Sequence, residues 1–163
     1  MISNKLLDSI LEVANLHASR IKIALEHVLL LEPITKEKLM NLEHADLGFL
    51  ELLTSRFAKL QDIIGSKIFP IVLDMLQENT QNLSTLDRLH KLEKLEIIPN
   101  TQEWIEMRNT RNMVTHEYPH EYEITANNIK VIIEHAKLLL TYWDNLSKKI
   151  LKLQKDILPN DQN

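Results

Sequence analysis

The sequence contains no cysteine and has very little glycine and proline. Without cysteine there is no disulfide, no thiolate nucleophile and no cysteine-based zinc site. Its two glycines, Gly48 and Gly65, are too few for a glycine-rich phosphate loop or a dinucleotide-binding fingerprint. With only five prolines as well, the chain is poor in turn-forming residues, which argues against a turn-rich β fold and predicts long helices with short connections.

Long apolar runs and an excess of positive charge are missing too. The longest apolar run, Val28–Leu31, is far shorter than the ~20 residues that a membrane-spanning helix needs. The first residues lack a signal-peptide pattern, because the acidic Asp8 and Glu12 follow at once. We therefore expect a soluble, cytoplasmic protein with no membrane partner. The net charge of −4 is unusual for a nucleic-acid binder, so a role on RNA would require a local basic patch.

Apolar residues recur at helical spacing through most of the 163 residues, a length typical of about one domain. The pattern predicts helices over about 3–31, 36–64, 85–96, 101–115 and 126–157. We expect a single all-α domain over residues 1–163, built as an up-and-down bundle of about five helices. Helices of this length leave a long flank on which the bundle can dimerise.

Capping and helix-breaking residues predict the boundaries of these helices. Thr35 is placed to cap the second helix, and Gly65 to break or kink it. Ser84–Asp87 and Asn100–Glu103 have the pattern of capping boxes, which start the next two helices. Thr125 is the expected cap of the last helix.

The segment from Arg111 to Tyr118 carries the candidate chemistry. It places Arg111, Asn112, His116 and Tyr118 within eight residues. An arginine binds phosphate and stabilises negative charge, and a histidine both accepts and donates a proton near neutral pH. An arginine and a histidine together are enough to cleave a phosphodiester without a metal ion or a cofactor.

A structural role for the same residues is the alternative. Trp104, Arg108, Arg111 and Thr115 follow the spacing at which the other helices place aliphatic residues. The arginines then lie either at the edge of the bundle, where Arg108 would be an auxiliary phosphate contact, or inside it and paired with carboxylates. The candidate carboxylates are Glu51, Asp62 and Glu103. His116, taken alone, is explained by the helix dipole, which favours a cation at a C-terminus.

The remaining histidines and lysines have simpler interpretations. His116 and His120 have the spacing of a helical metal pair, but Pro119 lies between them and no third ligand is in register, so we expect no metal site. The other histidines are interpreted as surface or core packing: His17, His27, His44, His90 and His135. A basic end of the last helix is interpreted as a solvated face, with contact to an RNA backbone as the alternative: Lys148, Lys149, Lys152 and Lys155.

The order Arg111-x4-His116-x-Tyr118 resembles the signature of the HEPN superfamily (higher eukaryotes and prokaryotes nucleotide-binding), in the extended form of its HepT-like branch. Asn112 takes the polar position that follows the arginine. Segments 56–62, 89–95 and 103–108 resemble flanking segments of the family, so that the resemblance in pattern covers most of the chain.

The resemblance implies a homodimer in which two such motifs face each other. Many HEPN proteins are metal-independent endoribonucleases that use no cofactor. The HepT-like ones are toxins, paired with a small nucleotidyltransferase antitoxin that transfers AMP to the tyrosine, here Tyr118. Arg111 would stabilise transition-state charge, His116 would transfer a proton, and Asn112 would orient the phosphate or the histidine.

RNA is therefore the expected substrate, and no DNA partner is expected. Other HEPN proteins have lost activity and bind nucleotides or partner proteins. The second hypothesis is accordingly a non-catalytic partner of a nucleotidyltransferase, which the acidic net charge favours. A third is a structural bundle whose Arg111 is merely salt-bridged.

Overall fold

The computed structural model describes residues 4–114 and 121–157. Over these residues the protein consists of helices and their connections, with no β-strand, which confirms the all-α prediction. In chain order the elements are α1 (Asn4–Leu29), α2 (Lys36–Met40), α3 (His44–Ile63), the π-helical turn η1 (Ile64–Ile68), α4 (Phe69–Met75), α5 (Thr85–Lys94), α6 (Thr101–Met113) and α7 (Tyr122–Ile157). None of the described helices is both long enough and apolar enough to cross a bilayer.

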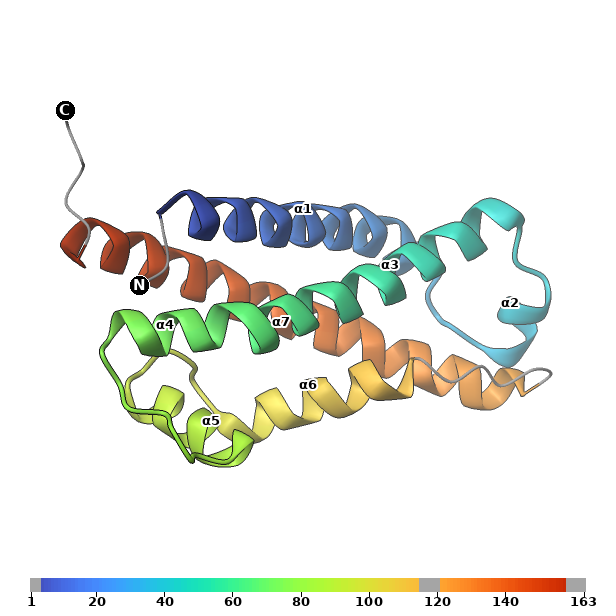
Figure 1. Ribbon diagram of the computed structural model, residues 1–163. Coiled ribbons are helices and arrows are strands. Elements are labelled where there is room, and N and C mark those ends of the chain that lie inside the picture. Colours follow the sequence, from blue (N-terminus) through green and yellow to red (C-terminus); the bar gives the residue numbers. More distant parts are fainter. Residues whose placement is uncertain (1–3, 115–120, 158–163) are drawn as a thin grey trace.

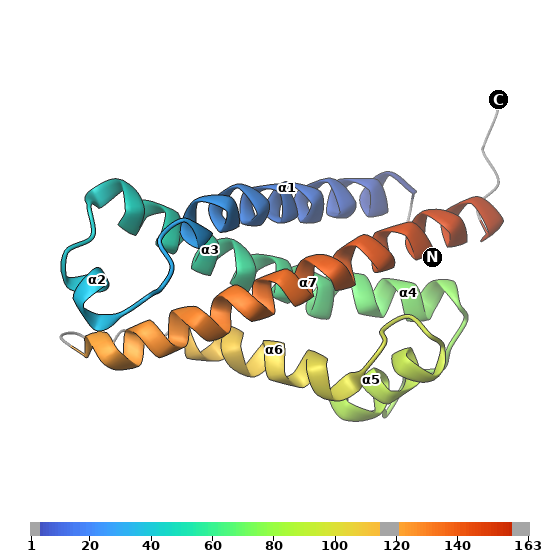
Figure 2. The same ribbon diagram turned by 180° about the vertical axis from the view of Figure 1, so that it is seen from behind.

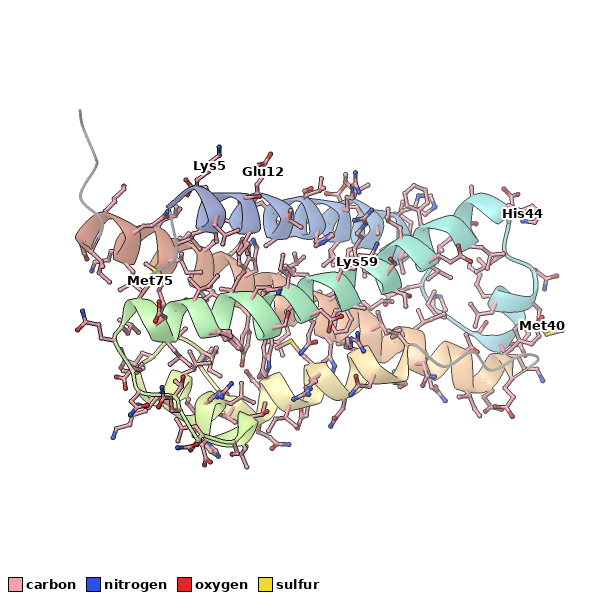
Figure 3. The ribbon with its side chains drawn as sticks, in the orientation of Figure 1. Lys5, Glu12, Met40, His44, Lys59 and Met75 are labelled. Carbon is pink, nitrogen blue, oxygen red and sulfur yellow. The ribbon has the colours of Figure 1, made fainter. Side chains whose placement is uncertain are left out.

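Four long elements run alternately up and down the molecule (Figure 1). Helices α1 and α6 lie on opposite sides of a central pair formed by α7 and the continuous rod α3–η1–α4 (Figures 1 and 2). The short helix α5 packs beside the start of α6 at one end, and α2 packs against α7 near the other. Met75 and Met40, labelled in Figure 3, mark these two ends.

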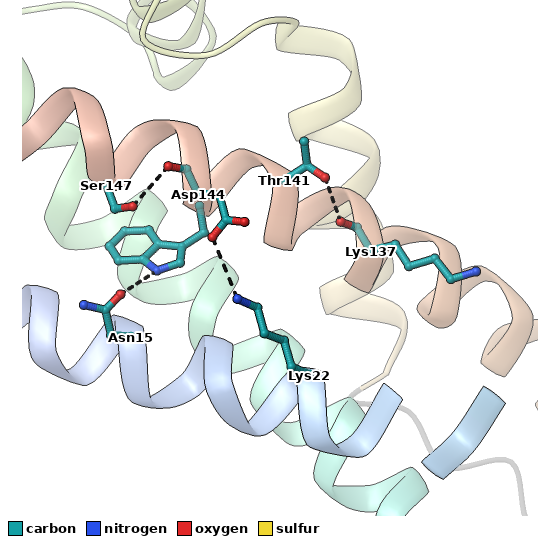
Figure 4. A network of polar contacts seen from close by, with 7 residues as sticks. Asn15, Lys22, Lys137, Thr141, Asp144 and Ser147 are labelled. Atoms are coloured by element: carbon teal, nitrogen blue, oxygen red, sulfur yellow. Dashed lines mark hydrogen bonds and ion pairs between the residues drawn. The ribbon is translucent and has the colours of Figure 1, made fainter. Parts of the chain in front are cut away.

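Helix α7 contributes a continuous line of buried residues to the core, as its regular apolar stripe predicts. Its stripe is buried at nearly every position: Ile129, Ile132, Ala136, Leu139, Trp143, Leu146 and Ile150. Burying each such large side chain contributes about 1.5–3 kcal/mol, so this stripe outweighs any surface contact. The indole of Trp143 also donates to Asn15 Oδ1 at 2.9 Å, beside the exposed Lys22–Asp144 ion pair (Figure 4). This polar seam fixes α7 against α1.

The single helix predicted over 36–64 is instead two helices at an angle. Thr35 caps the first of them as expected, since its hydroxyl accepts from the Lys38 backbone N–H at 3.1 Å. After α2, Asn41 closes the helix by donating from its side chain to the Glu37 carbonyl at 2.8 Å. The two helices have different main neighbours, since α2 packs against α7, whereas α3 packs chiefly against α1 and less extensively against α7.

Gly65 neither ends the helix nor leaves a sharp kink. It lies in η1, where the backbone N–H of Phe69 bonds to the carbonyl of Ile64, five residues back. The wider turn is explained by Pro70, which cannot donate to the helix and whose ring crowds the preceding turn. The chain then continues as α4 to Met75, so one rod passes the site described below.

Helices α5 and α6 begin after their predicted capping residues, whereas the predicted start of α7 is wrong. Ser84 and Asp87 form the expected capping box, and Asn100 Oδ1 accepts from the Glu103 N–H at 2.9 Å. Helix α7, however, begins at Tyr122 rather than after Thr125. Thr125 lies inside the first turn and donates its hydroxyl to the Glu121 carbonyl at 3.1 Å, so it is not the cap.

Candidate functional site

Arg111 lies in the last turn of α6 and reaches across to α3. Its Nη2 donates to Asp62 Oδ2 at 2.6 Å, and its Nη1 donates to Asn112 Oδ1 at 3.3 Å. The Arg111 and Asp62 side chains are 30% and 49% exposed, so the pair lies at the surface of the bundle and open to solvent. Asp62 is one of the three carboxylates that the structural interpretation proposed for this arginine.

The contact with Asp62 leaves part of the guanidinium unused. Asp62 binds through one nitrogen, and Nε of Arg111 is buried with no hydrogen-bond partner among the described residues. An arginine presents five N–H donors in a fixed fork, and a bidentate pair with a carboxylate would use two of them. Arg111 is thus restrained by Asp62, and because Nε is buried, the second N–H groups of Nη1 and Nη2 are the donors that remain to receive an anionic group.

The other two motif positions lie outside the described residues. His116 and Tyr118 fall in the segment 115–120, together with His120. The described part of the motif is therefore Arg111, Asn112 and their surroundings.

The buried line of α6 differs from the one that the sequence suggested. Thr101, Trp104, Met107 and Thr110 are buried, whereas Arg108 is exposed. The reason is that polar Thr110 has a partner inside: its hydroxyl lies 2.7 Å from His135 Nδ1 on α7. That bond fixes the rotation of α6, which turns Arg108 outward and leaves Arg111 half-buried at the edge.

Glu103, another candidate partner of Arg111, instead binds Tyr142 and so holds α6 to α7. The hydroxyl of Tyr142, with one proton to donate, lies 2.7 Å from Glu103 Oε2 and 3.0 Å from the Asn100 carbonyl. Burial and then the hydrogen bond to Glu103 raise the pKa of Tyr142 well above its usual range. Tyr142 therefore stays neutral and anchors the start of α6, leaving Asp62 as the partner of Arg111.

Three histidines have specific partners, contrary to their interpretation as simple packing residues. His135 bonds Thr110, and His27 Nε2 lies 2.8 Å from Asp46 while its ring stacks on Phe49. His44 and His90 are exposed. The partners of the first two come from other helices, so spacing along the sequence gave no sign of them.

The third case, His17, forms the centre of a basic cluster between α1 and α3. Arg56 Nη1 donates to His17 Nδ1 at 3.0 Å, so the imidazole accepts there and is neutral. Burial first, and then the charges of Arg56, Lys59 and Arg20, lower the pKa of His17. Lys59 is labelled on α3 in Figure 3. We call His17, Arg20, Arg56 and Lys59 the α1–α3 basic cluster.

The cluster has no counter-charge of its own. Among the described residues no carboxylate forms an ion pair with Arg20, Arg56 or Lys59, and Nε of Arg56 is buried without a partner. Lys59 and Asp62 are three residues apart on α3, and His17, Lys59 and Asp62 border one open hollow, so the cluster extends to the carboxylate that pairs with Arg111. In an acidic protein this is a local positive surface next to the motif arginine.

Metal binding has no support in the described part of the chain, where no three histidine, cysteine or acidic side chains gather closely enough to hold an ion. A cavity of about 320 Å³ lies between the α3–η1–α4 rod and helices α5 and α6. Asp62 and Arg108 both border this cavity. The lysines at the end of α7 are exposed.

Comparisons with protein-family models, with curated proteins and with solved structures gave no match to this chain.

Proposed function

We propose that the protein is a metal-independent endoribonuclease of the HEPN type, acting as the toxin of a bacterial toxin–antitoxin pair. The observation that carries the proposal is the state of Arg111: an arginine at an open edge of the bundle, restrained by one carboxylate and with donors to spare. It stands five residues before His116, in the order that resembles the HEPN motif.

The proposed reaction uses the ribose itself as the nucleophile. The 2′-hydroxyl attacks the adjacent phosphorus, the bond to the 5′-oxygen of the next nucleotide breaks, and a 2′,3′-cyclic phosphate and a 5′-hydroxyl result. His116 removes the 2′-proton or protonates the leaving oxygen, which contributes on the order of 10²–10⁴-fold. Arg111 stabilises the charge on the phosphorane oxygens, and Asn112 orients the phosphate or the histidine.

The α1–α3 basic cluster supports RNA as the substrate. RNA binding draws most of its affinity from phosphate contacts, which the net charge of −4 does not favour over the whole molecule. Arg20, Arg56 and Lys59 provide the local patch that such binding requires, and Lys59 borders the same hollow as Asp62, the partner of Arg111. Arg108 is an exposed auxiliary contact.

Dimerisation and regulation complete the proposal. Two copies would bring two Arg111–His116 motifs together in one cleft. A small nucleotidyltransferase would silence the toxin by transferring AMP from ATP to the Tyr118 oxygen, with pyrophosphate as the leaving group. The added phosphate places negative charge beside the motif and repels the RNA backbone.

The Arg111–Asp62 ion pair favours a second candidate. If this pair only ties α6 to α3, the chain is a non-catalytic partner of a nucleotidyltransferase. The two candidates differ in whether the purified protein cuts RNA.

The test is cleavage of end-labelled RNA by the purified protein in EDTA. We expect the wild type to cut, and Arg111→Ala or His116→Ala to reduce the rate about 100-fold or more while the fold stays intact. Asp62→Asn should retain cleavage, because the guanidinium keeps its charge and its free donors. Lys137→Ala, on the exposed face of α7, is the matched control for loss of one cation.

An inert wild type under these conditions would replace the ribonuclease with the binding partner. Equal cleavage by Arg111→Ala and Lys137→Ala would remove Arg111 from the mechanism. Sedimentation of the active protein as a monomer would exclude a cleft shared by two copies. Tyr118→Phe should still cut and should not accept AMP; transfer to this variant would identify another acceptor.

A further inference from the structure

The cavity beside Asp62 lies between two walls at one end of the bundle. The α3–η1–α4 rod forms one wall, and helices α5 and α6 form the other (Figure 1). Its volume of about 320 Å³ lies near the lower limit for small-molecule sites, which run from about 300 to 1,000 Å³. Apolar side chains line its interior, among them Phe69, Leu73 and Trp104.

Gln61 places a polar group with no partner at this cavity. The residue is only 3% exposed, and its side-chain amide makes no hydrogen bond to another described residue. The amide atoms are not among the fully buried atoms without a partner, so they keep a small accessible area. It borders the cavity. Buried amides are normally hydrogen-bonded, because burying one without a partner is unfavourable. The amide carries both donors and an acceptor, so it is suited to a ligand with a hydrogen-bonding group.

Two arginines from different helices border the same cavity. Arg108 of α6 forms no ion pair or hydrogen bond with any described residue, and Arg88 of α5 has only a 3.5 Å contact to the Thr80 carbonyl. The acidic residue at the cavity, Asp62, is already paired with Arg111. Two guanidinium groups without counter-ions give the opening a positive charge.

The π-helical turn keeps the cavity open. Gly65 and Ser66 of η1 both border it. A Cβ atom at Gly65 would stand 3.4 Å from Cζ2 of Trp104, in van der Waals contact, and would occupy space between the two walls. Turns of this kind inside helices are frequent at functional sites.

We propose that this cavity binds a small phosphate monoester with an apolar, ring-sized body that carries a hydrogen-bonding group. The phosphate, with close to two negative charges, binds Arg88 and Arg108 and is within reach of the hydroxyls of Ser66 and Thr85. The body lies against Trp104, and the Gln61 amide bonds to it. The site adjoins the RNA-cleaving motif, because Asp62, the partner of Arg111, and Arg108 both border the cavity, but ligand binding needs no RNA.

The test is calorimetric titration of the whole protein with phenyl phosphate, beside inorganic phosphate and phenol. Phenyl phosphate supplies the anion and the ring together, and each of the others supplies one of them. We expect phenyl phosphate to bind at least about tenfold more tightly than either, and to raise Tm with the logarithm of its concentration once the site is saturated. Arg88→Ala with Arg108→Ala should weaken it at least about tenfold, as the loss of charged hydrogen bonds does.

Two further variants test the cavity without risk to the fold. Gly65→Ala should weaken phenyl phosphate binding by filling space, while the protein without ligand keeps or gains thermal stability. Gln61→Leu should bind a ring phosphate with a hydrogen-bonding substituent, such as 4-hydroxyphenyl phosphate, less tightly than wild type, because it removes the amide that bonds to the ring substituent. The Tm of the ligand-free variant should not fall, because that amide makes no hydrogen bond to another described residue. Lys137→Ala is the control and should bind as wild type does.

The proposal is overturned if phenyl phosphate binds no more tightly than inorganic phosphate. It is also overturned if Gly65→Ala binds phenyl phosphate as wild type does. Neither result depends on RNA cleavage, so loss of this site and loss of the ribonuclease proposal are separate outcomes.

Discussion

Single side chains in this protein derive their chemistry from partners on other helices. Arg111 meets Asp62, which is 49 residues earlier in the chain, and His17 meets Arg56, which is 39 residues later. Asp62 offsets the charge of Arg111, and Arg56, which can only donate, leaves His17 the role of acceptor at Nδ1. The cations beside Asp62 and His17 outnumber the acids, which makes this region the positive part of an acidic protein.

The pKa of His17 predicts a dependence of stability on pH. Burial and the charges of Arg56, Lys59 and Arg20 lower this pKa below the ordinary value of 6.5. As pH falls below 6.5, the unfolded chain takes up the proton before the folded protein does, so the His17 contribution to stability is present above that pH and is lost on acidification. Urea unfolding at pH 7.5 and 5.5 should therefore show a smaller loss of stability for His17→Gln than for wild type. Equal losses would contradict this assignment.

At the level of the helix, capping residues decide where each element begins and packing decides where it bends. Thr35, Ser84 and Asn100 all cap as their sequence context predicts, because a cap bonds within three residues of itself. The division into α2 and α3 and the π turn η1 are not local in origin. They follow from which neighbour each segment packs on, and in η1 from Pro70.

Loss of the Ser84 cap should destabilise the protein through α5. The Ser84 hydroxyl accepts from the Asp87 N–H at 3.1 Å and lies 2.6 Å from the Asp87 carboxylate. We expect Ser84→Ala to lower the free energy of unfolding by about 1 kcal/mol, measured by urea denaturation with an unchanged m value. The control is Ser19→Ala within α1, where the hydroxyl bonds only to the Leu16 carbonyl and alanine is the better helix former. A cost as large for Ser19→Ala would show that capping is not the cause.

Over the described part of the whole molecule, positive charge is gathered at the α1–α3 basic cluster, at the cavity opening beside Arg88 and Arg108, and toward the end of α7 at Lys148 and Lys152. The cluster borders the same hollow as Asp62, the partner of Arg111. Under the proposed function, we expect an RNA strand held at Arg111 to contact the cluster rather than the end of α7.

Salt dependence of RNA binding distinguishes these two surfaces. Arg56→Gln with Lys59→Gln and Lys148→Gln with Lys152→Gln change the net charge equally. The first pair should reduce the slope of log affinity against log salt by about 1.4, the loss expected for two single-strand phosphate contacts, and the second should leave it near the wild-type value. Fluorescence anisotropy with 2′-O-methyl RNA, which cannot be cleaved, measures both. Equal slopes for the two variants would remove the cluster from the RNA surface.

The sequence by itself determined the features that depend on neighbours along the chain. The all-α class, the buried stripe of α7 and the capping residues follow from contacts three or four residues apart, which any helix repeats. The order of Arg111, Asn112, His116 and Tyr118 is likewise a property of the chain, and the functional hypothesis began there.

Only the tertiary structure decided how the helices are rotated and which side chains then meet. The outward position of Arg108 follows from the bond between Thr110 and His135, and the cavity at Gln61 follows from the approach of α5 and α6 to the π turn. Neither the position of Arg108 nor the cavity can be recognised from a pattern in the sequence, because the rotation of a helix is set by packing against all its neighbours at once. The pairs Arg111–Asp62 and His17–Arg56 exist for the same physical reason.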